Sequence, residues 1–560
     1  MNDSLGEVDV VVIGGGVNGT GAARDLALRG LDVALFEKED FGAGATGASS
    51  GMIHGGLRYL THEPAVTKLS CTDSGAVQKI ASHMIFRIPF IFPFKRGVKV
   101  EGLPPGLAFH LLDGMLFAYD LYQPLKGGRS HQRLTPAEAL DLEPGLSTDI
   151  VGAVTFDEWG IDAARLCLAN ALSAAEAGAK VFNHCRVEAF LREGDEATGP
   201  IRGVRAVDTL DGTGRTVTCR AVLNAAGPWS ELVAARAGAT VKLRPAKGVH
   251  LILGGRVSNY ALSVTAVDGR SVFIEPWQDV TLVGTTDDDF YGDLDHLEAT
   301  FDEVNYLLQA VETILPSVRD HRVIDTWVGV RPTLWSYGPN EDRLSREHKV
   351  FDHREDGAEG LFSLAGGKLA SYRLMAEDAA DRICEYLGCG TPSSTSAEPL
   401  PGADGELLPE RWAGEFDLDE APVRKLCRRH GSRTPTILSF ARKAGASPGA
   451  LICRCQQVLE AEVAHVVRNE WAHTLGDVMR RTRLGAGPCG GIRCAYRAAQ
   501  VLAQVSGRDP AWAALEAQRF MGERYRSRRP ALNGFQARVE ALNAAFLSLH
   551  GPPPDSRSRT

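Results

Sequence analysis

The sequence contains no long hydrophobic run and no large excess of charge. No uninterrupted apolar stretch approaches the about 20 residues that a membrane-spanning helix needs. The net charge of -9 argues against general nucleic-acid binding, which requires an excess of positive charge. The first residues, MNDSLGEVDVVVIGGG, are acidic where a secretion signal is basic, so we expect a mature, cytoplasmic N-terminus.

Cysteines are few, and most of them stand alone. In a reducing cytosol the eleven cysteines do not predict a disulfide framework, so clustered ones indicate metal binding or catalysis. We interpret the scattered ones as small buried apolar residues: Cys71, Cys167, Cys185, Cys219, Cys384, Cys389 and Cys427. The other four form two tight pairs: Cys453 with Cys455, and Cys489 with Cys494.

The length of the chain sets the number of domains. A chain of 560 residues is too long for one hydrophobic core, so we expect two large domains and at least one small one. With 44% apolar and 23% charged residues, the composition is ordinary for a soluble globular enzyme. No internal repeat is visible, and no paired Asp/Glu constellation suggests carboxylate catalysis; we interpret the acidic triple at 287–289 as a solvated turn.

The opening segment VDVVVIGGGVNGTGAARDLALRGLDVALFEKED has the pattern strand, glycine turn, helix and second strand. Its G-x-G-x-x-G spacing permits a tight turn and close approach to a pyrophosphate, which the helix N-terminus then faces. An acidic residue at the end of the second strand can accept the ribose hydroxyls. The residues expected to bind a dinucleotide are Gly14, Gly15, Gly16, Asn18, Gly19 and Glu37.

Three later glycine-containing segments favour FAD over NAD. The loop GAGATGASSGMIHGGLRYL carries small and hydroxylated residues that can wrap a bound flavin, whereas a released nicotinamide needs an open cleft. AVLNAAGPWS and LFSLAGGKLASYR each end a strand in a glycine turn, and the second opens a helix whose N-terminus can stabilise negative charge. The expected contacts are Thr46, Ser49, Ser50, Gly51, Gly227, Gly366, Gly367, Lys368 and Leu369.

In the segments IHGGLRYL, NAAGPWS, GTTDDDFYGD, WVGVRP and GGKLASYR, the sequence resembles FAD-dependent glycerol-3-phosphate dehydrogenases. The resemblance implies a glutathione-reductase-like (Rossmann) α/β domain for FAD, joined to an α+β substrate domain with an antiparallel sheet. It implies hydride transfer from C2 of sn-glycerol 3-phosphate to the flavin, giving dihydroxyacetone phosphate, with electrons passed to quinone. Gly51 departs from the aerobic members, which tend to have lysine, and GGKLASYR replaces the usual GGKLTTYR.

The resemblance also implies a substrate site with several cations, which suit a phosphate dianion. The expected substrate-binding residues are Arg58, Tyr59, Arg331, Arg346, Lys368 and Ser371. His250 alternates with apolar residues in AKGVHLIL, as on a strand that faces a site, so we name it as the candidate general base. A satisfied core histidine is the alternative there. His54 is a weaker catalytic candidate that can simply support the flavin loop, and Arg331 is expected to contribute to catalysis.

The two cysteine pairs lie in ICRCQQV and RTRLGAGPCGGIRC, where glycines and cations surround them. Two short helices are expected between the pairs and a third after them. This stretch resembles the bacterioferritin-associated-ferredoxin type of [2Fe-2S] domain, which occurs in the anaerobic branch of the family. The resemblance implies that Cys453, Cys455, Cys489 and Cys494 hold a [2Fe-2S] cluster; structural zinc or free thiols are the alternatives.

We predict the following organisation. The FAD domain comprises residues 1–75, 150–230 and 355–390, and the substrate domain comprises 76–149 and 231–354. A linker (391–404), a small helical region (405–448), the iron-sulfur domain (449–505) and a helical tail with a disordered end (506–560) follow.

The stretch at 83–122 is rich in Phe, Ile and Leu beside cations. It suits either a surface that dips into the lipid headgroups or core segments beside a turn, so peripheral attachment to the cytoplasmic face of the inner membrane stays open. The expected partners are glycerol 3-phosphate, quinone or electron-accepting subunits, and further copies or subunits of an oligomer. The rival functions are a flavin oxidase of an amino or 2-hydroxy acid and a non-catalytic redox subunit.

Overall fold

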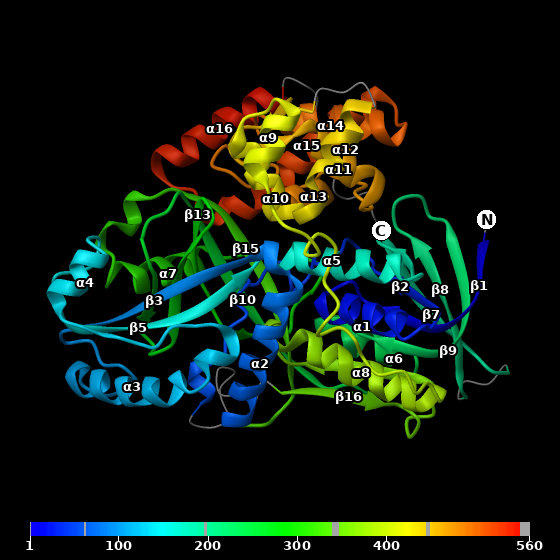
Figure 1. Cartoon of the computed structure of the whole chain (residues 1–560), viewed down its shortest axis with the longest axis horizontal. Helices are drawn as coiled ribbons and strands as arrows, with labels where there is room; N and C mark the ends of the chain where they lie inside the picture. Colours follow the sequence, from blue (N-terminus) through cyan, green and yellow to red (C-terminus); the bar gives the residue numbers. More distant parts are fainter. Residues whose placement is uncertain (1, 61–62, 195–198, 339–346, 444–447, 549–560) are drawn as a thin grey trace.

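The computed structural model describes residues 2–60, 63–194, 199–338, 347–443 and 448–548. Two β-sheets with their helices form the body of the molecule, and a layer of helices from the C-terminal third lies across both (Figure 1). This is the mixed α/β and α+β architecture, with a helical C-terminal region, that the sequence predicted.

The first sheet has a parallel core built from segments far apart in the sequence. Its order is β16 (His348–Asp352), β17 (Leu361–Gly366), β9 (Gly214–Asn224), β1 (Asn2–Ile13), β2 (Val33–Phe36) and β6 (Lys180–Phe182). Strands β7 (Cys185–Arg192) and β8 (Ile201–Asp208) extend it antiparallel from β9. Packed helices α1 (Val17–Leu28), α5 (Ala163–Glu176) and α8 (Tyr372–Leu387) bury the continuous apolar faces of the central strands.

The second sheet is mainly antiparallel. Its order is β14 (Asp288–Asp289), β10 (Leu243–Gly254), β13 (Val280–Gly284), β12 (Ser271–Trp277), β11 (Ala261–Thr265), β3 (Ile85–Lys95), β5 (Ile150–Ile161) and β4 (Arg133–Leu134), with β15 (Val323–Leu334) paired to the other edge of β10. Helices α2 (Pro64–Ile80), α3 (Pro105–Asp120), α4 (Pro136–Leu142) and α7 (Phe301–Glu312) accompany it. Strands β10 and β15 carry His250 and Arg331.

Two of the predicted domain boundaries do not coincide with the boundaries between the two sheets. Strand β5 pairs along its length with β3 in the second sheet, although the predicted FAD segment begins at residue 150. Strand β16 pairs with β17 in the first sheet, although the predicted substrate segment continues to 354. Strand pairing, which one sequence does not reveal, decides to which sheet a strand belongs.

The C-terminal layer is helical. It contains α9 (Pro409–Phe416), α10 (Glu420–His430), α11 (Thr434–Lys443), α12 (Glu460–Asn469), α13 (Leu475–Thr482), α14 (Ala495–Ser506), α15 (Pro510–Arg528) and α16 (Gly534–Ser548), with a short hairpin of β18 (Leu451–Cys453) and β19 (Val458–Leu459). The two helices expected between the cysteine pairs are α12 and α13, and α14 is the third. Residues 549–560, for which a disordered end was predicted, lie outside the described part.

Buried ion pairs fasten this layer to both sheets. Asp40, after β2, accepts two hydrogen bonds from Arg481 of α13, at 2.7 and 2.9 Å. Arg165 of α5 pairs with Glu470 at 2.7 Å, and Arg524 of α15 pairs with Asp325 of β15. Because breaking a buried pair leaves an uncompensated charge, these contacts fix where the layer sits.

Among the described residues, no helix is both long enough and apolar enough to cross a lipid bilayer. The stretch at 83–122 instead forms strand β3 and helix α3. Strand β3 belongs to the core of the second sheet, while α3 leaves several large apolar side chains exposed. The interpretation as core segments is therefore confirmed for β3, and the interpretation as a lipid-facing surface stays a prediction for α3.

Candidate active site

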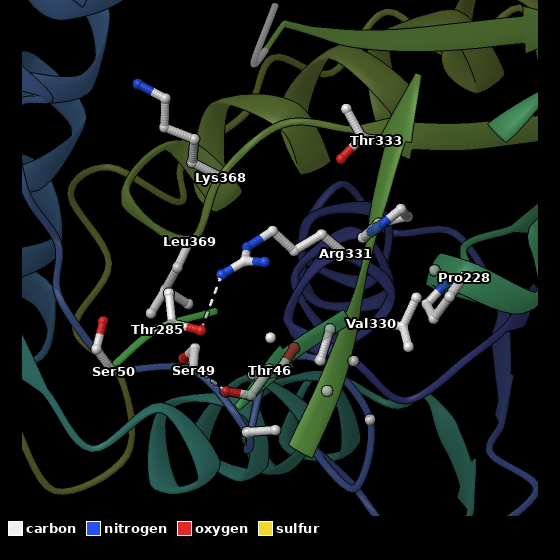
Figure 2. Close-up of a pocket in the computed structure, with 18 of the residues that line it drawn as sticks. Thr46, Ser49, Ser50, Pro228, Thr285, Val330, Arg331, Thr333, Lys368 and Leu369 are labelled. Carbon is white, nitrogen blue, oxygen red and sulfur yellow. Dashed lines mark hydrogen bonds between the residues drawn. The ribbon is translucent and has the colours of Figure 1, made fainter. Parts of the chain in front are cut away.

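One cavity of about 2740 Å³ runs between the two sheets and receives most of the predicted cofactor and substrate residues. Figure 2 shows the part of it around Arg331, where the Thr46–Ser50 loop, Pro228 and Lys368 meet. The lining includes Gly14, Gly16, Asn18, Glu37, Thr46, Ser49, Ser50, Gly51, His54, Tyr59, Gly227, His250, Arg331, Gly366, Gly367, Lys368 and Leu369. The ends of distant segments thus converge on one continuous space.

The glycine turn after β1 has the geometry of a dinucleotide-binding loop. A side chain at Gly19 would place its Cβ 1.9 Å from the carbonyl oxygen of Gly14, so only glycine lets α1 approach the turn this closely. The Glu37 carboxylate accepts hydrogen bonds from the backbone N–H groups of Gly15 (2.6 Å) and Glu39 (2.8 Å). Glu37 is therefore held at the cavity wall beside the turn.

The loop after β2 folds back over the N-terminus of α1. The Thr46 hydroxyl accepts a hydrogen bond from the backbone N–H of Val17 (3.1 Å), and the Ser49 hydroxyl donates to the carbonyl of Thr46 (2.8 Å). Gly51 has φ +74°, and an added Cβ would lie 2.4 Å from the carbonyl oxygen of Ile161. This backbone therefore has no room for the lysine that the aerobic members carry here.

Arg331 is a cation of the cavity wall that two neighbouring side chains hold in place. Its Nη1 lies 2.8 Å from Asp287 Oδ1, and its Nη2 donates to Thr285 Oγ1 at 3.2 Å (Figure 2). Asp287 is only 12% exposed, so the interpretation of the acidic triple as a solvated turn is wrong for Asp287, whereas Asp288 and Asp289 are exposed. The segment GTTDDD runs on from the end of β13, a strand that pairs with β10. Its place beside Arg331 depends on the register of β10 against its neighbouring strands, which the sequence alone does not reveal.

The other predicted substrate residues lie at different places. Lys368 Nζ lies 3.8 Å from the centre of the Tyr59 ring, and both residues line the cavity with His54. Ser371 instead points its hydroxyl toward the sulfur of Met375, at 3.8 Å, and does not line the cavity. The side chain of Arg58 and the whole of Arg346 lie outside the described part of the chain.

His250 is 6% exposed and lies under the flavin loop. One ring nitrogen hydrogen-bonds the backbone of Ala48, and no described residue hydrogen-bonds Nδ1. Burial, and then the positive charge of Arg331, lower the pKa of His250 to about 3. The imidazole is therefore neutral at physiological pH, which makes it available as a base but a weak one.

This buried ring predicts a pH effect on stability. Because its pKa falls from 6.5 in the unfolded chain to about 3 in the fold, the unfolded state takes up the extra proton below pH 6.5, and stability is lost as pH falls. His250→Gln should therefore gain about 1.4 kcal/mol relative to wild type for each pH unit between 6.5 and 4.5. Urea unfolding across this range measures the difference. His110→Gln, at an exposed ring, is the control, and the same pH trend in both variants would contradict a buried neutral His250.

The residues of this cavity fit FAD. The turn at Gly14–Gly19 offers backbone N–H groups and a helix N-terminus to a pyrophosphate, and Glu37 offers carboxylate oxygens to a ribose. His250, which lines the cavity, has a buried Nδ1 that no described residue hydrogen-bonds. Such groups are normally satisfied in native proteins, by a bound group or by water.

The four clustered cysteines form two pairs, and each pair contains one cysteine from each of the two motifs. Cys455 Sγ lies 3.8 Å from Cys489 Sγ, and the thiol of Cys494 hydrogen-bonds Cys453. This hydrogen bond, with those from the backbone at Gly485 and Gln456, lowers the pKa of Cys453 to about 6, despite burial. The hydrogen bonds around Cys453 therefore favour its thiolate, the form that binds a metal.

The pairing bears on which metal group the cysteines fit. A separation of 3.8 Å is that of two thiolates on one tetrahedral ion with bonds of about 2.3 Å. A single zinc ion would bring all four sulfurs this close, yet no three of these described cysteines have sulfurs within 4.8 Å of one another. Gly487 also approaches Cys455 so closely that an added Cβ would lie 3.2 Å from its sulfur. Two thiolate pairs in a glycine-rich loop fit a two-iron cluster better than one zinc ion.

Comparison with known proteins gives matches along nearly the whole chain. The family described as FAD dependent oxidoreductase matches residues 9–381. The family described as the C-terminal domain of alpha-glycerophosphate oxidase matches residues 393–512, which include the predicted linker, helical region and cysteine-rich region. Two family descriptions thus cover most of the two-sheet body and the helical layer up to the start of α15.

Individual relatives agree. The chain is 33% identical to a subunit of the anaerobic glycerol-3-phosphate dehydrogenase of Haemophilus influenzae, over 98% of this chain and 94% of that protein. It is 34% identical to the glycerol-3-phosphate dehydrogenase of Mycobacterium leprae, over 98% and 92%. The glycerol-3-phosphate dehydrogenase from Bacillus halodurans, solved with FAD, superposes with a TM-score of 0.72 at 26% identity, covering 94% of this chain and 96% of that one. The chain therefore belongs to the FAD-dependent glycerol-3-phosphate dehydrogenase family.

Proposed function

We propose that this protein oxidises sn-glycerol 3-phosphate to dihydroxyacetone phosphate. The observation that carries the proposal is Arg331, which stands on the wall of the same cavity as the flavin-binding turns (Figure 2). A guanidinium held at 2.8 Å by Asp287 is placed before substrate arrives, so little side-chain entropy is lost on binding a phosphate. FAD supplies the acceptor for the hydride that leaves C2.

Two tasks remain for the side chains of the site: they position the substrate, and they take the proton of its C2 hydroxyl. Arg331 anchors the phosphate, a remote part of the substrate whose binding energy orients C2. Lys368, held over Tyr59, adds a second positive charge to the cavity that His54 also lines. His250 and His54 are the candidate bases for the C2 hydroxyl proton. The neutral state of His250 lets it accept that proton, although its low pKa makes it a weak base.

Product analysis tests the reaction. Purified protein with FAD, glycerol 3-phosphate and an artificial electron acceptor should form one dihydroxyacetone phosphate for each two electrons accepted. Glycine and D-lactate, supplied in the same assay, represent the rival oxidases. Turnover of either with none of glycerol 3-phosphate would overturn the proposal, and turnover of no small substrate would favour a redox subunit without catalysis.

For the electrons we propose a [2Fe-2S] cluster on Cys453, Cys455, Cys489 and Cys494. The two thiolate pairs and the glycine-rich loop around them support this assignment. Such a cluster supplies one-electron chemistry, which converts a two-electron oxidation into single steps. The chain's own part is to hold the cysteine loop against α15, where Phe520 packs on Gly485, and thereby to fix the loop relative to β15.

We further propose a quinone as the electron acceptor, reached through an apolar arm of the cavity. This arm is lined by Phe90, Phe92, Leu103, Ala108, Leu111, Leu112 and Met115. It runs under α3, whose outer side exposes Leu107 (50%), Phe117 (68%) and, just beyond its end, Leu121 (79%). Apolar side chains beside Lys95, Arg96 and Lys99 suit a lipid surface, from which an apolar quinone can enter the arm.

Charges on α3 should separate membrane docking from substrate oxidation. The double variant Leu107→Glu/Phe117→Glu is expected to lower binding to anionic phospholipid vesicles about tenfold or more, because it removes apolar area and adds repulsion. Sedimentation with vesicles measures this, and turnover of vesicle-embedded quinone should fall in parallel. Flavin reduction by substrate should not change. Val267→Glu, at a valine that is 90% exposed elsewhere, is the control; equal losses in both variants, or in neither, would remove α3 from this role.

A further inference from the structure

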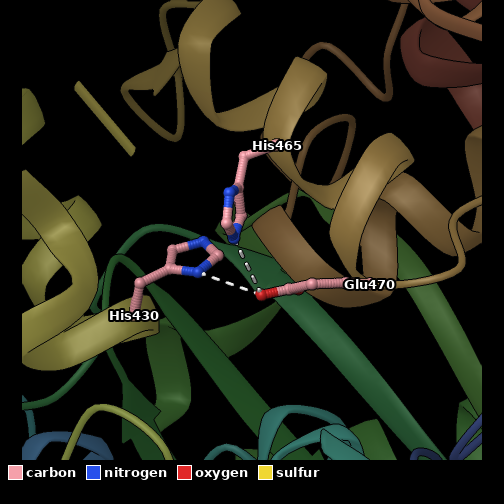
Figure 3. A group of neighbouring side chains, drawn as sticks. All are labelled: His430, His465 and Glu470. Atoms are coloured by element: carbon pink, nitrogen blue, oxygen red, sulfur yellow. Dashed lines mark ion pairs between the residues drawn. The ribbon is translucent and has the colours of Figure 1, made fainter. Parts of the chain in front are cut away.

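We propose that His430, His465 and Glu470 form a divalent metal site, distinct from the four cysteines, that takes Zn²⁺. His430 ends α10, His465 lies on α12 and Glu470 follows α12 (Figure 3). Their ligand atoms all lie within 4.8 Å of one another. Both imidazoles point at one carboxylate oxygen, Glu470 Oε1, with His430 Nδ1 at 3.3 Å and His465 Nε2 at 3.6 Å.

These separations match the edges of a tetrahedral zinc site. Zinc binds imidazole nitrogen and carboxylate oxygen at about 2.0–2.2 Å, which places neighbouring ligand atoms about 3.3–3.6 Å apart. The two separations of 3.3 and 3.6 Å fall in this range. Two imidazoles and one carboxylate are borderline ligands that suit Zn²⁺ rather than Ca²⁺ or Mg²⁺, which prefer oxygen alone. Three protein ligands leave the fourth position to water.

A hydrogen bond to a second carboxylate orients His430 as a metal site requires. His430 Nε2 lies 3.0 Å from Glu462 Oε1, so the ring donates there and turns the lone pair of Nδ1 toward Glu470. Arg429 in turn holds Glu462 through two hydrogen bonds of 2.6 and 2.7 Å. The amide nitrogen of Asn469 lies 3.1 Å from His465 Nδ1 and donates to the His465 carbonyl at 3.2 Å, so Nδ1 accepts and Nε2 carries a proton that a bound metal would displace.

Arg165 divides its contacts in a way that admits an ion. Its Nη1 binds the outer oxygen of Glu470, Oε2, at 2.7 Å and leaves Oε1 to the two imidazoles. Its Nη2 lies 3.4 Å from His430 Nδ1, at the long limit of a hydrogen bond. A dication replaces this weak contact while keeping the strong one. The metal then joins α10 to α12, and Glu470 joins both to α5 of the first sheet.

The position indicates a structural ion rather than a catalytic one. His430 and Glu470 are buried, and the side chain of His465, 14% exposed, is the point of access. None of the three residues is among the described ones that line the flavin cavity. The site therefore does not depend on the proposed reaction, and it can be occupied with or without substrate.

Metal binding to the full-length protein tests the site. Wild type, exposed to Zn²⁺ and freed of excess by gel filtration, should retain one equivalent that persists in Cys453→Ser/Cys489→Ser. Titration of that cysteine variant with Co²⁺ should give the visible bands of a tetrahedral ion without the near-ultraviolet band of a thiolate ligand. His465→Gln should weaken Co²⁺ binding about tenfold or more. His473→Gln, the same change at a histidine outside the trio, should bind as wild type does.

Melting curves and flavin content keep the result decisive. If His465→Gln melts and binds FAD normally yet loses Zn²⁺, the assignment holds. The unaltered trio is tested in the cysteine variant without any change to its ligands, so a folding failure of the histidine variant cannot hide the answer. A normally melting cysteine variant that retains no Zn²⁺, or full retention in His465→Gln, would overturn the proposal.

Discussion

Replacing Arg331 with alanine is expected to lower kcat/KM for glycerol 3-phosphate by about 30- to 1000-fold. This corresponds to about 2–4 kcal/mol of transition-state stabilisation, the scale for losing one charge-assisted contact in a dehydrated site. The change also removes the 2.8 Å ion pair with Asp287, so a carboxylate on the cavity wall is less well neutralised as the phosphate enters. Steady-state kinetics with an artificial acceptor measure the loss.

Two comparisons separate phosphate binding from support of Asp287. Arg331→Ala/Asp287→Ala removes the repelling carboxylate and should recover only part of the activity, because the anchoring guanidinium is still absent. Arg319→Ala, which breaks an exposed ion pair with Glu312 in the same domain, should leave kcat/KM within about threefold. Full recovery in the double variant would show that Arg331 serves only to neutralise Asp287.

Replacing Cys489 with serine is expected to remove the iron. The wild-type protein, prepared without oxygen, should contain about two irons per chain and a brown chromophore distinct from the flavin, as a [2Fe-2S] cluster requires. Cys489 lies 3.8 Å from Cys455, so its loss breaks one of the two thiolate pairs. Iron analysis and visible absorbance measure the effect.

The same variant separates the cluster from the hydride step. Flavin reduction by glycerol 3-phosphate should stay intact, because the flavin cavity is lined without these cysteines. Quinone reduction distinguishes two exits for the electrons: it falls when they leave through the cluster, and it persists when the quinone meets the flavin under α3. Cys427→Ser, at a buried cysteine in α10, is the control and should keep its iron. Iron that survives in Cys489→Ser, or a wild type that holds zinc on its cysteines and no iron, would contradict the cluster.

Much of the fold could be predicted because its signals are local. The glycine turn of α1, the helices between the cysteine pairs and the continuous apolar strands of the first sheet are all written in short stretches of sequence. The sheet assignments of β5 and β16 could not be predicted in this way. Whether a strand joins one sheet or the other depends on partners about 60 residues away in the case of β5 and β3.

The site shows the same division. Gly14 and Gly367 were predicted to contact the cofactor, and both line the cavity. They could be identified from the sequence because the shape of a glycine turn is a property of the local backbone. The partnership of Arg331 with Asp287 was missed because it needs the register of β10 against β15 and the turn after β13. Likewise, His430 and His465 lie on different helices, so only packing reveals that they converge on Glu470.

Anaerobic reduction of the bound flavin, followed by absorbance, tests the central claim most directly. Purified protein should carry FAD that glycerol 3-phosphate bleaches and glycerol does not, because Arg331 binds the phosphate and thereby positions C2. The measurement needs neither a quinone nor the cysteine cluster, so it isolates the hydride step. Equal bleaching by both compounds would contradict the role of the phosphate, and no bleaching by glycerol 3-phosphate would contradict the proposed function itself.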